Sequence, residues 1–117
     1  MSADRRIQLA DLQTTGKETI RVSVSYSKGG MNYFDYTTRP GGYWLQVAPI
    51  EIELSECGKF RMEKFNFGSG RRFFVAEASR FGRKALERAS EQARDMMAAA
   101  VSMVCDENGL ILEPVAG

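Results

Sequence analysis

The stretch IRVSVSYS, residues 20–27, decides the fold of this chain. Its larger apolar side chains, Ile20, Val22, Val24 and Tyr26, alternate with polar ones. A period of two is typical of a strand that buries one face against a core and leaves the other face uncovered. The stretch therefore predicts an antiparallel sheet with one buried face.

Further strand patterns follow this stretch, and short turns separate them. Lys28-Gly29-Gly30 and Arg39-Pro40-Gly41-Gly42 are turn sequences, because glycine accepts a positive φ and proline presets the second turn position. The segments with alternating or aromatic-rich patterns are residues 32–38, 43–47, 50–54, 59–67 and 71–76. Since no helical pattern interrupts them, they predict an antiparallel meander of four or five strands.

One long helix is predicted near the C-terminus. Apolar residues from Phe81 to Val104 recur every three or four positions, and charged residues occupy the other faces. Ser79 is a candidate N-cap, and Asn108-Gly109 is a helix stop. Because the apolar stripe must be buried, we expect an α+β domain in which this helix packs on one face of the meander. The residues expected to face the sheet are Leu86, Ala93 and Met97.

The length of 117 residues fits one domain. We expect an N-terminal arm at residues 1–17, the sheet-plus-helix domain at 18–109 and a C-terminal tail at 110–117. No apolar stretch long enough for a signal peptide follows the first residues. The most apolar run, Met96 to Cys105, is too short for a membrane span of about 20 residues. These features predict a cytoplasmic protein with free thiols and no membrane association.

The composition argues against catalysis. The chain contains no histidine, which is the commonest general base and metal ligand. Glu51 and Glu53 share a strand face and could bind a cation, but a solvated strand face is normally polar, and no third acidic ligand has a predictable place. Gly68–Arg72 could bind an anion, although a hairpin turn is the simpler interpretation. We expect a non-enzymatic protein without metal or cofactor.

Basic and aromatic residues gather in the sheet region. Residues 59–84 contain eight basic and two acidic side chains, and all twelve aromatic residues lie between Tyr26 and Phe81. Core packing accounts for most aromatic residues in proteins. Rings interleaved with cations, however, are also typical of surfaces that bind single-stranded nucleic acid by stacking and phosphate contacts. Basic residues in the first helical turn leave open either an anionic partner or pairing with neighbouring glutamates.

Several segments resemble a known group of proteins. Residues 32–36, 39–42, 43–47 and 72–75, with Phe81-Gly82-Arg83 at the helix start, are similar to segments of Pur repeats. Over residues 20–104, a meander followed by one helix resembles the Whirly, Pur and transcriptional-coactivator group of single-stranded DNA-binding proteins. The resemblance implies a sheet surface that carries nucleic acid and dimers formed through swapped or packed elements. The contacts it implies are Tyr36, Arg39, Trp44, Arg61 and Arg71.

We therefore expect a protein that binds single-stranded DNA or RNA through an aromatic and basic sheet face. The candidate contacts are Tyr36, Arg39, Trp44, Lys59, Arg61, Lys64, Arg71 and Arg72. A homodimer is expected because residues 96–103 are apolar nearly all round the helix. Its candidate interface residues are Met96, Met97, Ala100 and Met103. The alternative is a small protein-interaction or inhibitor module without nucleic-acid binding, since Tyr, Trp, Met and Arg are also enriched in protein interfaces.

Overall fold

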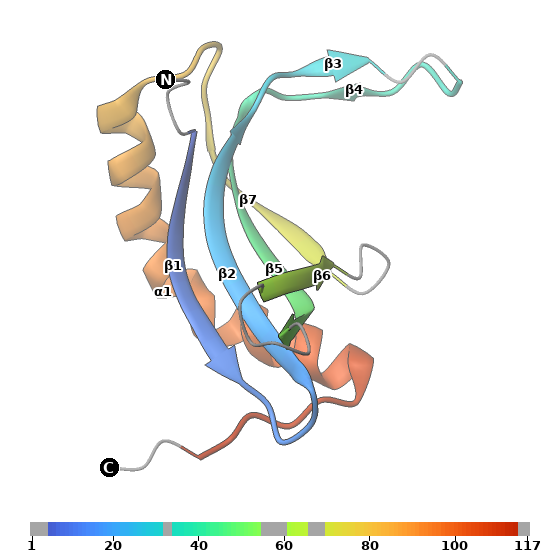
Figure 1. Ribbon diagram of the computed structural model, residues 1–117. Coiled ribbons are helices and arrows are strands. Elements are labelled where there is room, and N and C mark those ends of the chain that lie inside the picture. Colours follow the sequence, from blue (N-terminus) through green and yellow to red (C-terminus); the bar gives the residue numbers. More distant parts are fainter. Residues whose placement is uncertain (1–4, 32–33, 55–60, 66–69, 115–117) are drawn as a thin grey trace.

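The computed structural model describes residues 5–31, 34–54, 61–65 and 70–114, with the side chains of residues 53–54 and 61–65 left out of the description. The α+β class is confirmed, because one long helix packs on an antiparallel sheet (Figure 1). The sheet strands are β1 (Arg6–Gln13), β2 (Glu18–Ser27), β5 (Gly42–Leu54), β6 (Arg61–Phe65) and β7 (Arg71–Glu77). Two short strands, β3 (Gly30–Met31) and β4 (Thr38–Arg39), pair with each other, and α1 spans Arg83–Asn108.

The sheet is an antiparallel meander. β1 pairs with β2, and β2 pairs with β5 from Gly42 to Glu51. The other edge of β5 pairs with β7 along its first half and with β6 along its second half. β6 and β7 therefore follow one another along the same edge of β5.

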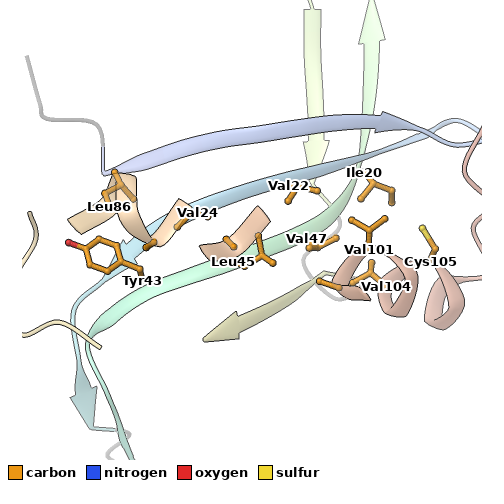
Figure 2. Close-up of a cluster of buried hydrophobic side chains, with 13 residues drawn as sticks. Ile20, Val22, Val24, Tyr43, Leu45, Val47, Leu86, Val101, Val104 and Cys105 are labelled. Atoms are coloured by element: carbon orange, nitrogen blue, oxygen red, sulfur yellow. The ribbon is translucent and has the colours of Figure 1, made fainter. Parts of the chain in front are cut away.

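Alternate side chains of β2 and β5 form one wall of the core, as the period of two predicts. Val22 lies opposite Val47, and Val24 lies opposite Leu45. All four side chains are fully buried, and each contributes about 1.5–3 kcal/mol through its burial. The helix supplies the other wall with Leu86, Ala89, Ala93, Ala100, Val101, Val104 and Cys105 (Figure 2).

The expected helix register is confirmed by the side chains that face the sheet. Leu86 and Ala93 are fully buried, and Met97 is half-buried against the core. The expected stop is also confirmed, because Gly109 adopts φ 65° at the C-cap, a left-handed conformation that glycine accepts without a steric penalty.

The helix start differs from the expectation. Gly82, not Ser79, is the N-cap, and it makes no side-chain capping hydrogen bond. The buried Tyr43 hydroxyl lies at this end, where it accepts a hydrogen bond from the Gly82 N–H at 2.9 Å. A group from β5 therefore satisfies a backbone donor that a local cap usually satisfies.

The strand expected at residues 32–38 is wrong for residues 34–37, whereas Thr38 lies in β4 and residues 32–33 lie outside the described residues. Phe34–Thr37 form a turn and loop, flanked by β3 and β4. Because β2 and β5 pair directly with each other, residues 28–31 and 34–41 become an arm that projects from their ends (Figure 1). A Cβ at Gly29 would lie 2.7 Å from the Gly41 backbone N, so the close approach at the base of the arm requires glycine.

The segments expected as an N-terminal arm and a C-terminal tail both form backbone hydrogen bonds with the rest of the fold. Residues 6–13, which we expected within an N-terminal arm, form the edge strand β1. In the expected C-terminal tail, the Ile111 carbonyl accepts a hydrogen bond from the Thr15 N–H at 2.8 Å. The Glu113 N–H donates to the Gln13 carbonyl at 2.9 Å. The C-terminal segment therefore covers the end of β1. None of the described helices is long and apolar enough to cross a membrane.

Candidate nucleic-acid interface

Trp44, Phe74 and Arg72 form an aromatic cluster on the sheet face opposite α1. Tyr43 points into the core, so the next residue along β5, Trp44, lies on the other face. The Trp44 and Phe74 ring centroids are 5.0 Å apart with an interplanar angle of 76°. The Arg72 guanidinium carbon lies 5.7 Å from the Trp44 ring centroid. Neither ring belongs to the core under α1.

Phe74 is the last residue of β7 before a bulge. Tyr43 pairs with Ala76 whereas Trp44 pairs with Phe74, which leaves Val75 as the extra residue. Val75 and Ala76 both pack against the core, although they are neighbours in sequence. Phe74 keeps the outward orientation and is 41% exposed.

The indole of Trp44 carries an unusual polar group. Its ring is partly buried, and its Nε1–H is buried without a hydrogen-bond acceptor among the described residues. An unsatisfied buried donor costs about 1–3 kcal/mol.

The neighbouring positions of this face carry mostly polar side chains. Ser25 pairs with Trp44, and Gln46 pairs with both Ser23 and Arg72. Farther along β2, Arg21 forms a two-pronged ion pair with Asp11 of β1, with both N–O distances at 3.0 Å. Arg21 is therefore engaged by a carboxylate, whereas Arg72 lies against a ring.

The two adjacent arginines that we expected to bind nucleic acid lie on opposite faces. Arg71 pairs in register with Val47 on the α1 side, and its Nε lies 2.7 Å from the Glu107 Oε2 of the helix. Arg72 lies on the outer face with Trp44. The structure thus brings Trp44 and Arg72 together and separates Arg71 from them.

Two other expected contacts lie on the arm. Tyr36 is 77% exposed and adopts φ 58°, and Arg39 is exposed on β4. In Figure 1 the arm projects from the ends of β2 and β5, away from the rest of the sheet. Tyr36 and Arg39 therefore belong to a different part of the fold from the aromatic cluster on β5 and β7.

The remaining expected contacts are described only in part. Lys59 lies outside the described residues. Arg61 and Lys64 are on β6, where Arg61 pairs with Leu54 and Lys64 pairs with Glu51. Their backbone positions extend the same edge of β5 that β7 occupies.

The four residues expected at a dimer interface do not share one exposed face. Ala100 is buried against the sheet, and Met96 and Met97 are half-buried beside the core. Met103 is 44% exposed. Helix packing within one chain therefore already uses three of the four, and the homodimer stays a prediction for which Met103 is the accessible residue.

At the helix N-terminus, one of the two alternatives left open by the sequence is observed for one cation. Arg83 lies 3.7 Å from Glu87 in an i,i+4 ion pair, so pairing within the helix engages this cation. Arg5 lies 5.4 Å from the Phe81 ring centroid, which adds another cation near this end. Neither contact identifies a ligand.

Phe74 is the residue that sequence reasoning missed. Its alternation with Phe73 and Val75 places it on the same face as Arg72, and this signal is local. Its contact with Trp44 depends on the long-range pairing of β7 with β5, for which the sequence contains no comparable signal.

No cluster of three potential metal ligands occurs among the residues that the structure describes. Comparison with protein-family models, curated proteins and solved structures yields no match. The candidate site therefore depends on its own geometry: two rings and one cation on the sheet face that α1 does not cover.

Proposed function

We propose that this protein binds single-stranded nucleic acid through the aromatic cluster on the sheet face opposite α1. The observation that carries the proposal is the Trp44–Phe74 ring pair with Arg72 against it, outside the core. A sheet face that no helix covers is normally polar, because water solvates it. Rings kept on such a face are suited to bases, each of which contributes about 1–3 kcal/mol by stacking.

The exposure of the two rings and the free energies of the contacts of Arg72 favour a specific order of contacts. Phe74 is the more exposed ring, so it is the first platform for a base, and Trp44 supports it from the side. An exposed cation–π contact between Arg72 and Trp44 contributes about 0.5–1 kcal/mol. A hydrogen bond to a charged group contributes about 1.5–3 kcal/mol. We therefore expect Arg72 to leave Trp44 for a phosphate, which uncovers the indole for a second base.

The proposal also includes a location in the cell and an oligomeric state. We infer a cytoplasmic location, which the buried free thiol of Cys105 supports because thiols persist in reducing compartments. We also retain the homodimer, supported by the exposed Met103. Neither feature is needed for a base to stack on Phe74.

The test compares Arg72→Ala with Arg71→Ala by fluorescence anisotropy, using labelled single-stranded and duplex oligonucleotides at several salt concentrations. We expect single-stranded binding that weakens with salt, and a slope reduced by about 0.7–1 in Arg72→Ala. Arg71→Ala is the matched control, because its side chain lies on the α1 side with Glu107. Loss of this exposed ion pair costs at most about 1 kcal/mol of stability.

Two results would count against the proposal. Equal effects of the two substitutions would mean that the outer face is not where phosphates bind. No binding of any oligonucleotide at low salt would leave the protein-interaction module as the better hypothesis.

A further inference from the structure

The arm, residues 28–31 and 34–41, carries large apolar side chains that lie outside the core. Phe34 is 98% exposed and Tyr36 is 77% exposed at its tip, and Met31 is 46% exposed on β3. None of the three contributes to the cluster of side chains under α1. Keeping rings in water is unfavourable, so their presence at the end of a projecting element points to a binding role.

The tip is held in one conformation by local hydrogen bonds. The Asp35 Oδ1 accepts from the Thr37 hydroxyl at 2.7 Å and from the Thr37 N–H at 3.1 Å. These bonds lower the pKa of the Asp35 carboxyl, so it is charged at neutral pH. Tyr36, between them, adopts φ 58°, which a tyrosine rarely accepts. The turn thus places Tyr36 at the tip of the arm in a left-handed backbone conformation.

A hollow of about 310 Å³ lies beside the tip. Its described lining is Gly30, Met31, Thr37 and Arg39. The volume is at the lower end of the roughly 300–1,000 Å³ range of small-ligand sites. Arg39 supplies a cation and Thr37 a hydroxyl, whereas Met31 supplies a polarizable apolar surface.

The size of the tip discriminates between a protein partner and a base. Two aromatic side chains offer roughly 300–500 Å² together, at about 150–250 Å² each. A stable protein interface needs about 800 Å² from each partner. One base needs only the face of one ring. Lys28 and Arg39 are both exposed on the arm, against the single carboxylate of Asp35, so the charge also favours a phosphate backbone.

We propose that the tip of the arm, with Phe34 and Tyr36 as platforms and Arg39 as the phosphate contact, is a second base-binding site for the strand that lies on the aromatic cluster. This inference rests on the proposed function. The arm grows directly out of β2 and β5, and β5 carries Trp44 just beyond its base. Eight residues separate Tyr36 from Trp44, so the two sites lie at most roughly 28 Å apart.

Two linked sites predict a dependence on oligonucleotide length. A short oligonucleotide reaches one site, whereas a longer one bridges both and gains from the high effective concentration of the second contact. The probes are oligothymidylates of about 4 and about 16 nucleotides, which bracket the usual site sizes of single-strand-binding domains.

The substitutions are chosen so that they can weaken binding without unfolding the protein. Tyr36→Asn removes the ring but keeps a residue that accepts the left-handed conformation. Phe34→Ser removes the other ring from an exposed position. Ile111→Ser is the matched control, because Ile111 is 68% exposed and lies toward the opposite end of the molecule from the arm (Figure 1). Thermal unfolding is measured for all three.

We expect each arm variant to weaken binding of the long probe by roughly 5- to 150-fold and to leave the short probe and the unfolding temperature unchanged. Ile111→Ser should leave both probes unchanged. Long-probe affinity that survives in both arm variants but falls in Arg72→Ala would overturn the arm site while the proposed function stands. No binding of either probe by the unmodified protein would overturn both. Concentration-dependent self-association that disappears in the arm variants, with long-probe affinity intact, would assign the arm to a second copy of the chain.

Discussion

The indole of Trp44 and the ring of Phe74 meet edge to face on the sheet face that α1 does not cover, with centroids 5.0 Å apart. The geometry is one that aromatic pairs prefer, because the positive edge of one ring faces the negative face of the other. The two rings come from strands that are separated by β6 in the chain order, so the contact exists only because β7 returns to pair with β5.

This relationship makes the single tryptophan a reporter of the site. We expect Phe74→Ala to shift Trp44 emission to longer wavelength and to increase its quenching by acrylamide, because the indole loses its neighbour. The same substitution should reduce affinity for single-stranded oligonucleotides by about 1–3 kcal/mol. Phe73→Leu, on the α1 side, should leave the emission unchanged. Emission that is insensitive to Phe74→Ala would contradict the observed ring contact.

The helix register predicts a large loss of stability on Leu86→Ala. Leu86 is fully buried in the core, so its truncation should cost about 2–5 kcal/mol in urea unfolding. Leu112→Ala is a control with the same chemistry, at a position that is 36% exposed. Its cost should be clearly smaller. Equal costs at the two positions would mean that α1 does not present Leu86 to the sheet.

Two glycines provide a paired test of the backbone packing. A Cβ at Gly42 would collide with the carbonyl oxygen of Ala76, whereas nothing lies within 4 Å of a Cβ at Gly30. We expect Gly42→Ala to destabilise the protein by at least about 1–3 kcal/mol, as overpacking does. Gly30→Ala should be neutral or stabilising by up to about 1 kcal/mol. A harmless Gly42→Ala would exclude the observed β5–β7 pairing at this point.

The buried thiol of Cys105 leads us to expect that the stability of the folded protein depends on pH above neutrality. Burial, followed by the charge of Asp106, raises the pKa of its thiol above the ordinary value for a cysteine. The folded protein therefore retains the proton at a pH where the unfolded chain loses it. The stabilisation is complete below about pH 9 and is lost as the pH rises through the folded pKa.

The measurement is urea unfolding at pH 8 and pH 10 in a Cys57→Ser background. Between pH 8 and pH 10, the free energy of unfolding of the Cys57→Ser protein should decrease. The decrease should be smaller in the protein that also carries Cys105→Ala, because this change removes the thiol. In the same background, a thiol reagent at pH 8 should modify Cys105 only after denaturation. Rapid modification of the folded protein would contradict the observed burial of Cys105.

Local patterns in the sequence determined the elements and the buried faces. The alternation of Ile20, Val22 and Val24 predicted which face of β2 enters the core, and the spacing from Leu86 to Ala93 predicted the stripe of α1 that covers it. Both patterns repeat within one element, because strand and helix geometry return every second, third or fourth side chain to the same face. The α+β class followed from them.

The tertiary structure alone decided the composition of the candidate site. The sequence grouped Arg71 with Arg72, but the register of β7 on β5 places Arg71 beside Glu107 and Arg72 beside Trp44. The sequence pattern also predicted a strand at residues 32–38. The direct pairing of β2 with β5 instead makes the described part of this segment part of the arm. Strand register and a bulge depend on the total packing of distant residues, and a shift of one position moves each side chain to the opposite face. For this reason the sequence predicted a ring and a cation on the outer face, and only the fold determined which ones meet.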